Sequence, residues 1–288
     1  MSMKLLHLGK PTIGDNHFYK RWETFGKVYA SLTEAAHDLN QIEVVIIDHY
    51  TIFDDQHLDI FPILKYIISP TTGHTHLKFT RDKFKGKLLT LRGEKEFLNE
   101  ICGVSEFTMY LLLRLCRELS PHPMLLKGKK IGVLGMGRIG SQVATRAEAF
   151  GMEVREFDKK HNQYYLKGLF ISCDFISIHL EENETTRWLV SKNLIYNMKP
   201  TAFLINTARG SIVNESSLMN ALVKKKIAGA AIDVKQSSYY LNEKTPNLII
   251  TNHIAGRAIE DRIRTDEFMI RKLRDELLQT IRIQTEMF

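Results

Sequence analysis

The sequence predicts an α/β protein with two parallel sheets, each flanked by helices and each forming its own domain. Three observations indicate this fold class. The chain has 288 residues, enough for two domains of ordinary size. Short apolar runs alternate with longer polar segments, as in parallel sheets with helical crossovers. A glycine-rich turn at residues 135–140 lies between a predicted strand and a predicted helix, near the middle of the chain.

The first sheet is predicted from five apolar runs of strand length, at residues 5–8, 28–30, 44–48, 66–69 and 88–91. Polar segments between them, such as residues 31–40, are expected to form the crossover helices. The loop at residues 69–74, Ser-Pro-Thr-Thr-Gly-His, follows the fourth run, and its N–H groups could hold an anion. Arg92 follows the fifth run and could contact a carboxylate. From these residues alone, an ordinary turn is the better interpretation of each loop.

The chain then enters the second domain through a predicted amphipathic helix at residues 101–120, which leads into the glycine-rich turn. In a dinucleotide site Gly135 makes the turn, Gly137 lets backbone N–H groups approach a pyrophosphate, and Gly140 lets helix and strand pack closely. The pyrophosphate lies at the helix N-terminus. Asp158 follows Gly140 by 18 residues, close to the roughly 20 expected for the acid that binds the adenosine ribose.

Five further strands are predicted after the turn, at residues 153–157, 174–179, 202–207, 228–233 and 248–252. With the strand at 131–135 they make six, which is typical of a doubly wound sheet. Asn214 is a plausible N-cap for a helix at 214–226. A last helix, at about 259–280, is expected to pack back on the first domain. The predicted domains are therefore residues 1–100 with 262–288, and residues 101–261.

Composition indicates a globular protein in a reducing compartment. The net charge is +7, but the basic residues are scattered in short groups, so no nucleic-acid or membrane partner is predicted. The cysteines Cys102, Cys116 and Cys173 have no metal-like spacing, and their odd number offers no disulfide framework. No apolar run approaches the roughly 18 residues that span a bilayer. We expect a cytoplasmic protein without a metal site.

Three polar residues follow predicted strands in the second domain: Arg209, Asp233 and His253. Taken singly, each has a structural interpretation, as a surface arginine, a strand-terminal acid bound to backbone, and a buried histidine. Because the carboxyl ends of parallel strands share one edge of a sheet, the three together favour a functional site.

The motifs GMGRIG at 135–140, INTARGSIVNE at 205–215, AAIDV at 230–234 and NHIAG at 252–256, together with Asp158, resemble the D-isomer-specific 2-hydroxyacid dehydrogenase family. SPTTGH at 69–74 resembles its substrate loop. The resemblance implies a flavodoxin-like substrate domain and a Rossmann NAD-binding domain with a cleft between them. It also implies hydride transfer between NAD and a 2-hydroxy or 2-keto acid, by an enzyme that is a homodimer.

The resemblance assigns roles to individual residues. Arg209 would hold the substrate carboxylate and keto oxygen, and His253 would exchange the proton. Backbone N–H groups of Thr72, Gly73 and His74, with Arg92, would bind the carboxylate from the first domain. The cofactor would be bound by Gly135, Met136, Gly137, Arg138, Ile139, Gly140, Asp158, His179, Thr207, Ala208 and Asp233. Asp233 would accept from the nicotinamide carboxamide, and Asp158 would favour NAD by repelling the 2′-phosphate of NADP.

The chain departs from the family pattern at three places. Ser238 stands where the family has a glutamate that pairs with the histidine, and Gln236 is the nearest possible substitute. Glu181 and Glu182 replace an apolar pair after His179. The linker at 118–127 is shorter than the family's dimer-forming segment. Ser238 favours an alternative function, that of a catalytically weak NAD-binding sensor or partner-binding protein on the same fold.

Overall fold

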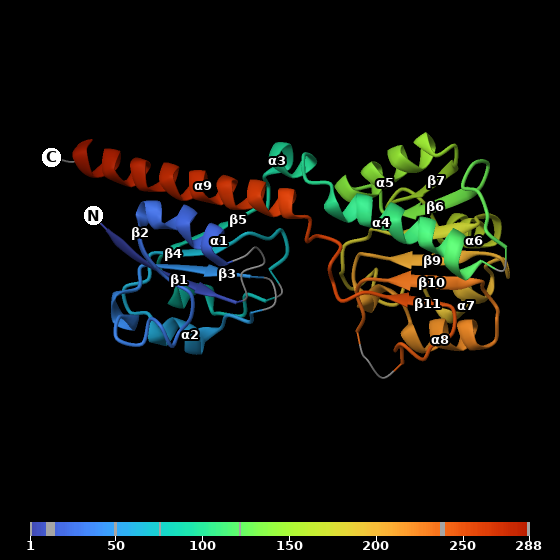
Figure 1. Ribbon diagram of the computed structural model, residues 1–288, viewed down its shortest axis with the longest axis horizontal. Helices are drawn as coiled ribbons and strands as arrows, with labels where there is room; N and C mark the ends of the chain where they lie inside the picture. Colours follow the sequence, from blue (N-terminus) through green and yellow to red (C-terminus); the bar gives the residue numbers. More distant parts are fainter. Residues whose placement is uncertain are drawn as a thin grey trace. The chain divides into compact units, whose positions relative to one another are not determined.

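The computed structural model describes residues 2–9, 15–48, 51–74, 76–120, 122–236 and 240–286. The chain forms two compact units (Figure 1). Unit 1 contains Met1–Glu100 and Arg257–Phe288, and unit 2 contains Ile101–Gly256. No helix in the described residues is both long enough and apolar enough to cross a membrane.

Unit 1 contains a five-stranded parallel sheet in the order β2-β1-β3-β4-β5. Its strands are β1 (Met3–Leu8), β2 (Gly26–Tyr29), β3 (Val44–Ile47), β4 (Tyr66–Ser69) and β5 (Lys87–Thr90). Its helical segments are α1 (Asp15–Trp22), η1 (Glu23–Phe25), η2 (Leu39–Gln41), α2 (Asp55–Ile60), η3 (Arg81–Lys83), α3 (Lys95–Asn99) and α9 (Ile259–Glu286). The order is that of flavodoxin-like folds, and all five predicted strands are confirmed.

The two faces of the first sheet bury separate cores because successive side chains of a strand point to opposite faces. Leu5 of β1 contributes to the face that also holds Trp22 and Leu273, so α1 and α9 belong to this core. Leu6 contributes to the opposite core, with Phe53 and Phe61. The prediction that the last helix packs on the first domain is confirmed.

The segment at residues 31–40 does not form the predicted α-helix. It consists of turns followed by η2, with i to i+3 bonds such as that from the Asp38 N–H to the Ala35 carbonyl, 2.8 Å. Asp38 also accepts from the Lys4 ammonium at 2.6 Å and from the Tyr29 hydroxyl. These long-range bonds hold the polar segment against β1 and β2, so tertiary contacts override its helical pattern.

Unit 2 contains a six-stranded parallel sheet in the order β11-β10-β9-β8-β6-β7. Its strands are β6 (Lys130–Leu134), β7 (Glu153–Phe157), β8 (Phe175–Ile178), β9 (Phe203–Asn206), β10 (Gly229–Ile232) and β11 (Leu248–Ile250). Its helical segments are α4 (Gly103–Arg114), η4 (Leu115–Leu119), α5 (Arg138–Ala149), α6 (Gln163–Ser172), α7 (Lys192–Tyr196), η5 (Gly210–Ile212) and α8 (Glu215–Val223). All six predicted strands are confirmed. The strand order reverses between β6 and β8, and in such sheets ligands bind at the carboxyl ends beside that point.

Helices cover both faces of the second sheet. α4 and α5 pack on one face through Leu111, Leu112 and Val143, and α6, α7 and α8 pack on the other. The predicted helix at 101–120 is an α-helix only to Arg114, and its last turn is π-helical.

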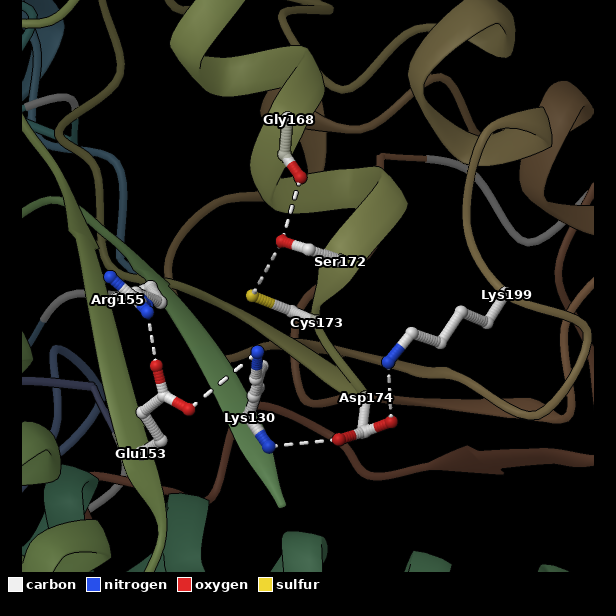
Figure 2. Close-up of polar contacts among 8 residues, drawn as sticks. All are labelled: Lys130, Glu153, Arg155, Gly168, Ser172, Cys173, Asp174 and Lys199. Atoms are coloured by element: carbon white, nitrogen blue, oxygen red, sulfur yellow. Dashed lines mark hydrogen bonds and ion pairs between the residues drawn. The ribbon is translucent and has the colours of Figure 1, made fainter. Parts of the chain in front are cut away.

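The amino edge of the second sheet carries a network of charged side chains, shown in Figure 2. The Asp174 carboxylate accepts from the Lys130 N–H at 2.8 Å and from the Lys199 ammonium at 2.8 Å. Glu153 pairs with Lys130 and Arg155. Burial raises the pKa of Asp174, but the N–H of Lys130 and the charge of Lys199 outweigh it, so the pKa is lowered overall. This edge stabilises the fold by pairing its charges with one another.

Candidate active site

The glycine-rich turn after β6 has one glycine that packing does not require. Gly135 has φ +96°, a conformation that favours glycine. A Cβ on Gly140 would lie 1.9 Å from the Gly135 carbonyl oxygen, so helix α5 could not approach the turn with any side chain there. A Cβ on Gly137, by contrast, would meet nothing within 4 Å. Open space at the N-cap of α5 is what an anion approaching the helix N-terminus needs.

The other predicted residues of this turn, Met136, Arg138 and Ile139, hold it in place through contacts with the rest of unit 2. Met136 and Ile139 are half-buried and pack against the core beneath α4 and α5. Arg138 donates from Nη1 to the Ile101 carbonyl at 3.0 Å. The turn is therefore fixed by contacts within unit 2, while its backbone faces outward at Gly137.

Asp158 follows β7 at the same edge of the sheet. Its carboxylate accepts from the Lys159 N–H at 2.7 Å, and its own N–H donates to His161 Nδ1 at 3.0 Å. His161 stacks on Tyr165, with ring centroids 4.3 Å apart and planes within 14°. Sequence reasoning missed these two rings, although both lie within seven residues of Asp158. Lys160 is paired with Glu156 at 2.6 Å, which offsets its charge near this position.

His179 follows β8, next to the turn. A Cβ on Gly135 would lie 2.8 Å from the His179 carbonyl oxygen, which shows how closely the two loops approach. His179 Nε2 lies 2.7 Å from the Ser177 hydroxyl. Burial of the ring lowers the pKa of His179 to about 3, so this imidazole is neutral at physiological pH.

The loop after β9 holds Arg209 through Asn206, a residue that sequence reasoning missed. The Asn206 amide donates to the Arg209 carbonyl and accepts from the Ala208 N–H, both at 3.0 Å. Arg209 is exposed, and its Nη1 donates to the Ala208 carbonyl at 2.7 Å. The buried hydroxyl of Thr207 lies 3.0 Å from that of Thr108 on α4. Hydrogen bonds to Asn206 and Thr108 therefore fix the backbone of the loop, while the Arg209 side chain is exposed.

Asp233 follows β10, the neighbour of β9 in the sheet, and His253 follows β11, the neighbour of β10. Asp233 is 1 % exposed, and its carboxylate accepts three hydrogen bonds from the loop that contains His253. His253 is exposed and has φ +53°. The structure thus brings Arg209, Asp233 and His253 to the same edge of three adjacent strands.

The loop expected to contain a partner for His253 is only partly described. Ser238 lies outside the described residues. The Gln236 N–H donates to the buried Glu215 carboxylate, and its side-chain oxygen accepts from Trp188 Nε1 at 3.4 Å. In the described structure the Gln236 side chain therefore accepts from Trp188, and its pairing with His253 stays a prediction.

In unit 1, the predicted substrate residues lie after two neighbouring strands, β4 and β5. Within the described part of the loop, the N–H groups of Thr72, Gly73 and His74 meet no protein acceptor. Burial and the charge of Arg92 lower the pKa of His74. A buried polar chain beneath the loop links His76 Nε2 to the Ser69 hydroxyl at 2.8 Å, and Ser69 to Thr71 at 3.0 Å. Sequence reasoning missed His76, because nothing in the turn-rich sequence around it distinguishes this histidine as a buried residue.

Comparison with known proteins places these features in one family. Residues 114–255 match the model of the D-isomer specific 2-hydroxyacid dehydrogenase, NAD binding domain. A glyoxylate reductase of Thermofilum pendens is 31 % identical over 254 residues, 76 % of this chain and 74 % of that protein. A glyoxylate reductase of Aeropyrum pernix is 39 % identical over 163 residues, 50 % of this chain and 48 % of that protein.

A solved D-lactate dehydrogenase from Aquifex aeolicus, complexed with NAD and lactic acid, has the same fold. Its TM-score is 0.74 at 21 % identity, and the match covers 97 % of this chain and 96 % of that one. The chain matches about half the length of the first curated relatives. These matches, with the two parallel sheets, define a two-unit α/β protein whose second unit binds a nicotinamide dinucleotide. The chain belongs to the D-isomer specific 2-hydroxyacid dehydrogenase family, and unit 2 is its NAD-binding domain.

Proposed function

We propose that the chain is an NAD-dependent oxidoreductase that interconverts a D-2-hydroxy acid and a 2-keto acid. The observation that carries the proposal is the placement of Arg209, Asp233 and His253 at the ends of three adjacent strands. This is the edge that also holds the outward-facing Gly137 and Asp158. A dinucleotide laid along this edge would extend from Asp158 past the glycine turn toward Arg209 and His253.

The residues have the chemistry that ketone reduction requires. Bound NADH supplies the hydride, and negative charge then develops on the keto oxygen. Arg209 is a permanent cation whose planar fork can hold the carboxylate and this oxygen together. His253 can give the oxygen a proton and retrieve it in the reverse direction, because an imidazole can both donate and accept a proton near neutral pH. The N–H groups of Thr72, Gly73 and His74, which meet no acceptor among the described residues, suit the substrate carboxylate together with Arg92.

The remaining residues of the proposed site serve the cofactor. The Gly135–Gly140 turn would hold the pyrophosphate, with Met136, Arg138 and Ile139 supporting it. His179, Thr207 and Ala208 would line the nicotinamide side. Asp158 would bind the adenosine ribose, and because Glu156 offsets the charge of Lys160, we propose that NAD is preferred to NADP. A homodimer and a cytoplasmic location belong to the same proposal.

A panel of small 2-keto acids with NADH tests the function. Because relatives of this chain are named glyoxylate reductase and hydroxypyruvate reductase, we expect turnover of glyoxylate or hydroxypyruvate. The product should be the D isomer where C2 is a stereocentre. Saturable NADH binding without turnover of any acid in the panel would contradict the proposal and favour the NAD-binding sensor.

A further inference from the structure

The Asp233 carboxylate is the centre of a small hydrogen-bonded cup formed by residues 251–255. Its Oδ1 accepts from the Thr251 hydroxyl at 2.6 Å and from the Ile254 N–H at 2.9 Å. Its Oδ2 accepts from the Ala255 N–H at 2.9 Å. The Asp233 backbone carbonyl accepts from the His253 N–H at 2.8 Å. One residue therefore ties the chain on both sides of His253.

The backbone of His253 needs such a restraint. Its φ of +53° lies in the left-handed region, which is uncommon for residues other than glycine. Conformations of this kind persist only where the surrounding structure fixes them. His253 is also exposed, so burial of its own side chain contributes little to holding it. The bonds to Asp233 on either side help to maintain the conformation.

We infer that Asp233 is a positioning residue, which fixes the His253 imidazole where it can exchange a proton with the substrate. The inference rests on the proposed function. A carboxylate offers about four acceptor positions, and three are used within the protein. At most one position, on Oδ2, is left for a cofactor amide. Asp233 therefore acts mainly on the protein loop and only secondarily on the dinucleotide.

Asp233→Asn separates the two roles. The amide has the same shape, but its NH2 group cannot accept, so at least one of the three donors is left facing another donor. We expect kcat per NADH-binding site to fall about 100-fold, while KM for NADH changes less than about threefold. In the cofactor-free protein, hydrogen exchange at the Ile254 and Ala255 amides should become at least about 10-fold faster. An unchanged kcat with a raised KM for NADH would overturn the inference.

Thr251→Val is the matched variant, because it removes only the hydroxyl donor and keeps the β-branched shape and both N–H bonds. We expect changes in the same direction but smaller, about threefold to 10-fold in kcat. This variant also decides the question if Asp233→Asn does not fold, and unchanged kcat and unchanged exchange would then overturn the inference. If the wild-type protein reduces no keto acid, the proposed function fails by itself. In that case hydrogen exchange is the measurement that tests whether Asp233 positions His253. Unchanged protection of the Ile254 and Ala255 amides would then overturn the inference.

Discussion

The two edges of the unit 2 sheet hold an aspartate in different ways, one half-buried and the other buried. At the amino edge, Asp174 is held by the Lys199 ammonium and by one backbone N–H (Figure 2). At the carboxyl edge, Asp233 is held by a hydroxyl and two backbone N–H groups, all of them neutral. The first arrangement ties strands together, and the second fixes the conformation of an exposed histidine. The difference agrees with the proposal that the carboxyl edge serves chemistry while the amino edge serves stability.

Of these substitutions, Arg209→Gln should have the largest effect. It should lower the activity without changing the stability of the fold. The side chain is exposed, so we expect the free energy of unfolding to change by less than about 0.5 kcal/mol. Without the guanidinium, kcat/KM for glyoxylate should fall by about 1000-fold, because charge on the keto oxygen loses its stabilisation. Steady-state kinetics and chemical denaturation measure the two quantities. Arg155→Gln, at the amino edge, is the control and should alter neither by much.

Asp266 extends the comparison to unit 1, because among the described residues this buried acid has no such network of hydrogen bonds and ion pairs. It is 6 % exposed, and burial, only partly offset by Arg262 and Arg21, raises the pKa of Asp266 to about 7. A carboxyl whose pKa is raised on folding costs stability as pH rises from its ordinary 3.8 through about 7. Asp266→Asn should therefore stabilise unit 1 by about 2 kcal/mol at pH 8. The gain should shrink as pH falls toward 4, and urea unfolding at several pH values measures it.

Asp174→Asn should lower the free energy of unfolding, by an amount similar to or smaller than the gain expected from Asp266→Asn. The pKa of Asp174 is lowered in the folded protein, so its contribution to stability is present above the ordinary value of 3.8 and is lost as pH falls through the folded value. At pH 7 we expect a loss of about 1–2 kcal/mol. Turnover per folded molecule should not change. A loss of kcat without a loss of stability would contradict the division between the edges.

The strands could be predicted because buried parallel strands are continuous apolar runs, as in β3 and β10, in which every residue is buried. The turns at 31–40 could not be predicted, because Asp38 bonds to Lys4, 34 residues away, and to Tyr29 on the preceding strand. At the candidate site, Arg209, Asp233 and His253 could be found from their positions after strands. The left-handed backbone of His253 and the cup around Asp233 could not, because both depend on how the ends of β10 and β11 meet. The family glutamate's position, Ser238, lies outside the described residues.

The central claim is that the carboxyl edge of unit 2 directs hydride transfer to C2 of a 2-keto acid. The most direct test uses NADH labelled with deuterium at C4 and hydroxypyruvate, followed by mass and chiral analysis of the product. The account predicts one deuterium at C2 and the D isomer, and it predicts that Arg209→Gln forms this product about 1000-fold more slowly. An L product, or a D product that carries no deuterium from either face of the labelled nicotinamide, would contradict it.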